Sequence, residues 1–207
     1  MELKHILEAA LMASGRPLTL DEFGRLFDEA ERPNEAELLM ALEHMAEEYQ
    51  WRPMELKKVA SGYRLQVREA YSPWISKLFE ERPGRYSRAF LETLVIIAYR
   101  QPATRGEIEE IRGVAVSSSI IKTILEREWI EVIGHKEVPG RPALFGTTPH
   151  FLDYFGLTSL AELPPLKEFI DPLGGESAGV DALLTTMNQP QTAAMADSPH
   201  DLNNSHE

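Results

Sequence analysis

Two stretches of the sequence share one pattern and decide the fold: residues 13–22 read ASGRPLTLDE, and residues 98–107 read AYRQPATRGE. Both follow the frame Ala-x3-Pro-x-Thr-x2-Glu, and the second begins 85 residues after the first. Thr followed three residues later by Glu is a capping box, in which the two side chains satisfy free backbone amides at the start of a helix. Each stretch therefore predicts the end of one helix and the start of another.

Apolar residues before these two stretches repeat in the same register. The stripe before the first stretch consists of Leu3, Ile6, Leu7, Ala10 and Leu11. The matching stripe in the second copy consists of Leu91, Leu94, Val95 and Ala98. Both have the spacing of an amphipathic helix. A shared capping frame with a matching stripe before it predicts two copies of one fold.

Each copy continues with a third helix and two strand-like segments. The expected helices are residues 34–50 and 117–127, and the expected strands are residues 54–59, 63–68, 130–136 and 144–147. Three helices followed by a hairpin are the order of a winged helix-turn-helix domain. The predicted fold class is therefore mainly α with small β-wings (α+β), arranged as two tandem winged helix-turn-helix domains.

The expected domains are residues 1–81 and 87–169, joined by a linker at residues 82–86 that contains Pro-Gly. Residues 170–207 are expected to form a disordered acidic tail. Residues 171–207 hold six acidic and no basic residues, which is half of the net charge of −12. They contain no Phe, Tyr or Trp, so they offer too little apolar surface to offset the entropy lost on ordering.

The composition restricts the classes of function. The 207 residues include 33 Asp and Glu against 21 Lys and Arg, a balance that repels nucleic acid. Cys is absent, which excludes disulfides, thiol nucleophiles and cysteine-ligated zinc. No apolar run is long enough to span a membrane, and the first residues do not resemble a signal peptide. We expect a cytoplasmic protein without a membrane partner.

The third helix of a helix-turn-helix domain is the one that normally enters the major groove of DNA. In the first copy this helix has no Lys or Arg and carries five carboxylates, Glu35, Glu37, Glu43, Glu47 and Glu48. In the second copy two basic residues, Lys122 and Arg127, stand beside Glu126 and Glu128. Binding to phosphates needs a surplus of positive charge. The charges therefore favour a protein partner over DNA.

The sequence supports an enzyme even less than it supports a DNA-binding protein. The six His residues are scattered, and no phosphate-binding loop or nucleophile elbow is present. Glu107 and Glu110 share a helix face beside Arg105 and Arg112, which is typical of a solvated charged surface. We predict no catalytic, cofactor-binding or metal-binding residues.

The central block of the chain resembles a known family. Residues 82–114, RPGRYSRAFLETLVIIAYRQPATRGEIEEIRGV, closely resemble the signature of bacterial segregation and condensation protein B. VPGRPALFGTT (138–148), FLDYFGL (151–157) and LAELP (160–164) resemble its later blocks. The likeness covers residues 1–167, and it is carried by pattern rather than by motif over residues 19–80.

The resemblance implies a non-catalytic subunit of the bacterial SMC–kleisin complex, a condensin-like assembly that acts in chromosome condensation and segregation. Family members are expected to homodimerise largely through the first domain. They are also expected to bind the kleisin subunit, segregation and condensation protein A, and through it the SMC ATPase. The resemblance implies no small-molecule substrate, no cofactor and no strong direct binding of nucleic acid.

Two groups of residues are candidates for these contacts. The partner-binding candidates on the second domain are Tyr99, Arg100, Arg105, Arg112 and Arg141. Arginine is enriched at interfaces because it combines forked donors with a plane that stacks. The candidates for the dimer interface are Leu3, Leu7, Leu11, Trp74 and Phe79. A domain of this size leaves part of its apolar surface uncovered, so a second subunit or the neighbouring domain would cover such residues.

Two other functions stay open on the residues alone. A transcriptional regulator would bind DNA through the second domain, which has balanced charge and carries Arg141 at its wing tip; its binding would weaken steeply with salt. An enzyme with an unrecognised site would gather titrating groups in a deep pocket.

Overall fold

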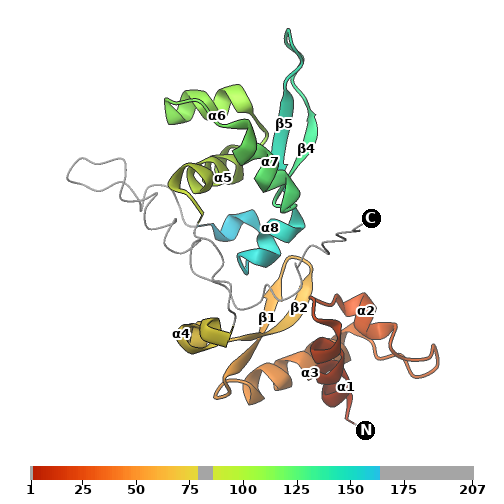
Figure 1. Ribbon diagram of the computed structural model, residues 1–207. Coiled ribbons are helices and arrows are strands. Elements are labelled where there is room, and N and C mark those ends of the chain that lie inside the picture. The colour runs from red at the N-terminus through yellow and green to blue at the C-terminus, as the bar shows by residue number, and fades with distance from the viewer. Residues whose placement is uncertain (1, 79–85, 164–207) are drawn as a thin grey trace, which may run out of the picture. The chain divides into compact units, whose positions relative to one another are not determined.

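The computed structural model describes residues 2–78 and 86–163 (Figure 1). The described residues divide into two compact units: unit 1 contains residues 2–57 and 62–78, and unit 2 contains residues 58–61 and 86–163. Three sequence-based expectations lie outside the described residues: most of the linker, the acidic tail at 170–207, and Phe79 as a dimer residue.

Unit 1 is built from three helices, a hairpin and a short helical segment. The helices are α1 (Leu3–Ser14), α2 (Leu20–Gly24) and α3 (Glu35–Glu48), and the paired strands are β1 (Met54–Val59) and β2 (Gly62–Val67). The chain then forms η1 (Glu69–Tyr71), α4 (Ser72–Ile75) and η2 (Ser76–Leu78).

Local sequence signals set the helix ends of unit 1. The Thr19 hydroxyl accepts from the Glu22 N–H and the Glu22 carboxylate accepts from the Thr19 N–H, so the predicted capping box is formed. Asn34 and Glu37 form an equivalent box at the start of α3. Gly15, with φ of 63°, ends α1 in the left-handed conformation that glycine adopts readily.

The core of unit 1 lies between α1, α2 and α3. Its fully buried side chains include Leu7, Phe23 and Met45. Backbone hydrogen bonds of 2.9 Å in both directions join Leu18 to Tyr63 and so attach the chain before α2 to strand β2.

Unit 2 repeats the same order with a third strand added. Its elements are α5 (Arg88–Arg100), β3 (Ala103–Thr104), α6 (Arg105–Arg112), α7 (Ser118–Glu126), β4 (Ile130–His135), β5 (Ala143–Thr147), α8 (Pro149–Tyr154) and η3 (Leu160–Glu162). The antiparallel sheet has the order β3-β5-β4. Hairpin β4–β5 projects from the helices as a long wing (Figure 1).

The core of unit 2 is centred on Trp129, which is 1% exposed. The rings around it belong to Tyr86, Phe90, Tyr154 and Phe155, with centroids 4.5–6.0 Å from that of Trp129. Arg127 lies over the rings of Tyr86 and Trp129, at 4.9 and 5.6 Å from their centroids.

The predicted fold class is confirmed, because helices are followed by a small β-wing in each unit. The structure adds two elements that the sequence analysis did not assign. Residues 103–104 form strand β3 because Ala103 and Thr104 pair with Phe145 and Leu144 of β5. Residues 69–78 form the short helical segments η1, α4 and η2.

Candidate protein-binding surfaces

The helix of unit 1 that corresponds to a DNA-reading helix presents carboxylates to solvent. Glu35, Glu43 and Glu47 of α3 are exposed. Lys4 of α1 is hydrogen-bonded to Glu48 near the end of α3. This surface would repel a phosphate backbone.

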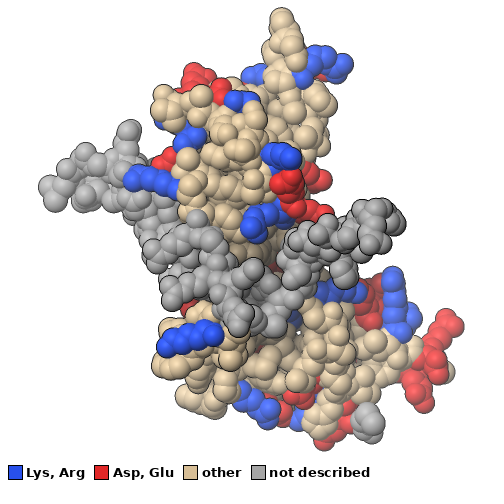
Figure 2. All heavy atoms as spheres, viewed as in Figure 1, with Lys and Arg blue, Asp and Glu red and all other residues tan. Residues whose placement is uncertain are grey.

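Cations on α7 and on the wing of unit 2 are paired with carboxylates. The pairs are Lys122–Glu126, Lys136–Glu107 and Arg141–Glu137, with N···O distances of 3.5, 2.6 and 3.0 Å. On the face shown in Figure 2, the blue and red side chains of unit 2 are interspersed. The surplus of positive charge that binding to phosphates requires is not present on these elements.

Arg105 holds two elements of unit 2 together. Its guanidinium bonds to Glu109 Oε1 at 2.9 Å, to Ser118 Oγ at 3.0 Å and to the carbonyl of Val116 at 2.5 Å. Glu109 in turn accepts from the N–H of Val116 at 2.9 Å. Arg105 therefore joins α6 to the segment that leads into α7, while its side chain remains 46% exposed.

The structure corrects the sequence-based interpretation of Arg112 as a partner-binding residue. Its side chain is only 7% exposed, and its Nη2 lies 3.2 Å from Glu92 Oε2 on α5. Glu92 also accepts from Arg88 Nε at 2.8 Å. Because Arg112 is buried between α5 and α6, it offers no surface to a partner, and we remove it from the binding candidates.

The other candidates of unit 2 differ in their surroundings. Tyr99 is half-buried against the core, and burial raises the pKa of its hydroxyl. Arg141 lies exposed between the wing strands and pairs with Glu137. Arg100 is exposed at the end of α5 and makes no ion pair or side-chain hydrogen bond with any residue that the structure describes.

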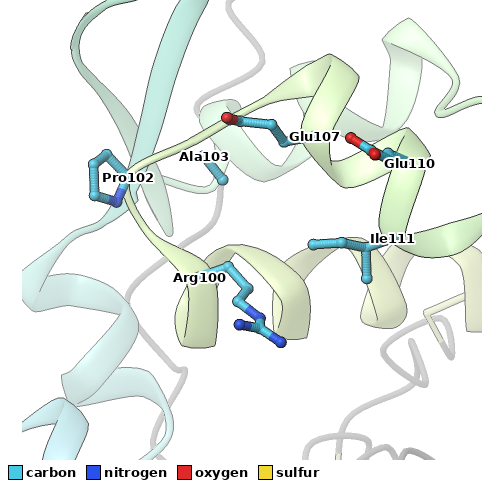
Figure 3. A pocket seen from close by; sticks show the side chains of 6 residues that line it. All are labelled: Arg100, Pro102, Ala103, Glu107, Glu110 and Ile111. Carbon is cyan, nitrogen blue, oxygen red and sulfur yellow. The ribbon is translucent and has the colours of Figure 1, made fainter.

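A surface hollow of about 400 Å³ lies beside Arg100 (Figure 3). It is lined by Arg100, Pro102, Ala103, Glu107, Glu110 and Ile111. Ile111 is 53% exposed, although it is a large apolar residue. Sequence reasoning did not select Glu110 and Ile111 as candidates because they fall within a highly charged stretch, which we interpreted as solvated surface.

The dimer candidates of α1 also need correction. Leu7 and Leu11 are 0% and 4% exposed, because both pack into the core of unit 1. Leu3 is half-buried against the same core. A subunit interface needs accessible side chains, so we remove Leu7 and Leu11 from the dimer candidates.

Trp74 is 65% exposed and does not stand alone. Tyr71 and Leu78 are 41% and 74% exposed, and η1, α4 and η2 contain no buried residue. On the face shown in Figure 2, a basic side chain lies among the uncharged atoms over α4. We call Tyr71, Trp74 and Leu78 the α4 stripe; their spacing of three and four residues is the sequence signal that could have identified them.

The two threonine capping boxes make the stability of the protein pH-dependent. Hydrogen bonds lower the pKa of Glu22 from 4.5 to about 2; the bond from the Arg16 side chain contributes most, and the bonds from Thr19 add to it. Hydrogen bonds also lower the pKa of Glu107 from 4.5 to about 2; the bond from the Lys136 side chain contributes most, and the bonds from Thr104 add to it. The unfolded chain therefore binds protons at a higher pH than the folded chain, and the stabilisation is lost as the pH falls from about 4.5 to about 2.

We expect Glu107→Gln to reveal this loss. Above about pH 5 the variant should unfold at lower urea concentration than the unchanged chain, because the neutral amide cannot form the ion pair with Lys136. The difference should shrink as the pH falls towards about 2, where Glu107 becomes protonated. Urea unfolding followed by circular dichroism across this range measures it. A difference that does not change with pH would contradict the assignment.

Within residues 2–78 and 86–163, no group of His, Asp and Glu side chains is arranged to hold a metal ion. In the same ranges, no helix has the length and apolar character needed to cross a membrane.

Comparison with known proteins gives consistent matches. The profile of a family described as "Segregation and condensation complex subunit ScpB" matches residues 5–166. A segregation and condensation protein B homolog of Coxiella burnetii is 56% identical over 168 residues, covering 81% of this chain and 80% of that protein. Segregation and condensation protein B of Syntrophotalea carbinolica is 43% identical over 173 residues, covering 83% and 85%. The crystal structure of ScpB from Mycobacterium tuberculosis is 34% identical, covers 76% of this chain and 96% of that one, and gives a TM-score of 0.35.

Proposed function

The chain belongs to the ScpB family of segregation and condensation complex subunits, and from this premise we propose that it is a non-catalytic, homodimeric subunit that binds the kleisin of a bacterial SMC complex. It acts in the cytoplasm on chromosome segregation and condensation, and it contacts the SMC ATPase through the kleisin. Unit 1 forms the dimer and unit 2 binds the kleisin.

The observation that carries this proposal is the charge of the elements that a DNA-binding winged helix would use. The third helix of unit 1 presents carboxylates, and Lys122, Lys136 and Arg141 of unit 2 are each paired with a carboxylate. Since counterion release from phosphates needs unpaired cations, the fold is better suited to a protein partner than to DNA.

Exposed apolar side chains support a protein partner for each unit. The α4 stripe of unit 1 is the larger group, and we assign it to a second copy of the chain. Unit 2 exposes Ile111 and Val114 at 53% and 57%, which we assign to the kleisin side. Burying one such side chain contributes about 1.5–3 kcal/mol, so a few of them can hold a partner.

The proposal is tested by co-expressing the full chain with the kleisin of the same bacterium and weighing the purified complex by native mass spectrometry. We expect a complex that contains two copies of the 23.4 kDa chain and at least one kleisin. Because the contacts are largely apolar, the complex should persist when salt is raised from about 50 to about 200 mM. Recovery of the chain alone, without kleisin, would contradict the proposal.

A further inference from the structure

The charged residues of α5 and α6 fall into two groups. Six of them pair with another residue of unit 2: Arg88, Glu92, Arg105, Glu107, Glu109 and Arg112. Arg100 and Glu110 form no ion pair or side-chain hydrogen bond with any described residue. Both line the same hollow, so the two charges of α5 and α6 that pair with no described residue lie on one small surface.

The hollow places these two charges on opposite sides of an apolar floor. Arg100 comes from the end of α5 and Glu110 from α6, and the Ile111 side chain lies between the two helices (Figure 3). The Arg100 guanidinium is turned away from Glu107 and Glu110 in the same view, so no contact within the hollow holds it. Pro102 and Ala103 complete the floor.

The surroundings show why the two charges stay free. Glu107 is already held by Lys136 and Thr104, so it does not attract Arg100. Arg105 and Arg112, the cations of α6, are held by Glu109 and Glu92 and are not available to Glu110. A volume of about 400 Å³ lies at the small end of the range for ligand sites and has room for one or two side chains.

We propose that this hollow receives one apolar side chain of the kleisin, flanked by a carboxylate that pairs with Arg100 and by a basic residue that pairs with Glu110. The inference rests on the proposed function and names the chemistry of the segment that binds. Charge complementarity favours this occupant, because a carboxylate and a basic residue beside the apolar anchor would pair with Arg100 and Glu110 and would be repelled in the opposite order. Short amphipathic segments bind grooves in this way.

Binding of purified kleisin to the full chain, measured by isothermal titration calorimetry, tests the inference. Arg100→Glu, Glu110→Arg and Ile111→Ser should each weaken binding about tenfold or more. The double variant Arg100→Glu with Glu110→Arg keeps the net charge and reverses the order of the two charges, so it should weaken binding at least as much as either single change. Lys122→Glu, a charge reversal on α7, is the matched control and should bind as the unchanged chain does.

A photo-crosslinking residue at position 111 gives a readout that does not depend on stability. It should crosslink to the kleisin, whereas the same residue at position 122 should not. Normal affinity in all hollow variants together with no crosslink from position 111 would overturn the inference and leave the proposed function standing. If the unchanged chain fails to bind kleisin, the proposed function falls and the inference falls with it.

Discussion

Arg112→Glu is expected to lower the free energy of unfolding of unit 2 by about 3–5 kcal/mol, because it replaces a buried, paired cation with a buried carboxylate. Arg112 is 7% exposed and lies 3.2 Å from Glu92. The substituted carboxylate would face Glu92, which would repel it. Hydrogen exchange of the backbone amides in α5 and α6 measures the change.

Arg141→Glu is the matched control for this prediction. Arg141 has the same charge but its side chain is 70% exposed, so the substitution should change stability by less than about 0.5 kcal/mol. If the backbone amides of α5 and α6 exchange as slowly in Arg112→Glu as in the unchanged chain, the buried pair between these helices does not exist in solution. Loss of kleisin binding by Arg112→Glu would report unfolding of unit 2, so this variant does not map the binding surface.

Trp74→Ser is expected to convert the proposed dimer into a monomer. Large aromatic residues at the centre of an interface typically contribute 2 kcal/mol or more, which corresponds to a dissociation constant raised by at least about 30-fold. Trp74 lies at the centre of the α4 stripe, between Tyr71 and Leu78, and is 65% exposed within one chain. Sedimentation equilibrium over a range of protein concentrations measures the shift.

Leu26→Ser serves as the control for the dimer prediction. Leu26 is 51% exposed and follows α2, which lies on the other side of unit 1 from α4 (Figure 1). In sedimentation equilibrium this variant should have the same assembly mass as the unchanged protein. If Trp74→Ser also has this mass, the α4 stripe is not the dimer interface.

Signals between near neighbours in the sequence predicted the fold well. Thr19 with Glu22, and Thr104 with Glu107, are three residues apart, and both pairs form the expected capping boxes. Capping depends on the backbone of one helical turn, so the sequence contains the information that it needs. The repeat of these boxes is what predicted two winged-helix copies.

The exposure of the candidate site residues depended on contacts that the sequence spacing does not reveal. Arg112 is buried because Glu92, 20 positions earlier, lies beside it on another helix. Glu107 is neutralised by Lys136, 29 positions later, on the wing. Arg100 is distinguished from the other arginines of α5 and α6 only when these pairings are known, because it forms no ion pair with any residue that the structure describes.

The most direct test of the central claim compares two ligands under the same conditions. Fluorescence anisotropy of a labelled DNA duplex and of labelled kleisin, each titrated with the full chain, is measured from about 50 to about 200 mM salt. We expect tight kleisin binding that changes little with salt and no saturable binding to the duplex at the higher salt. Tight duplex binding there, with no affinity for kleisin, would contradict the claim that these paired charges leave the winged helices to bind protein.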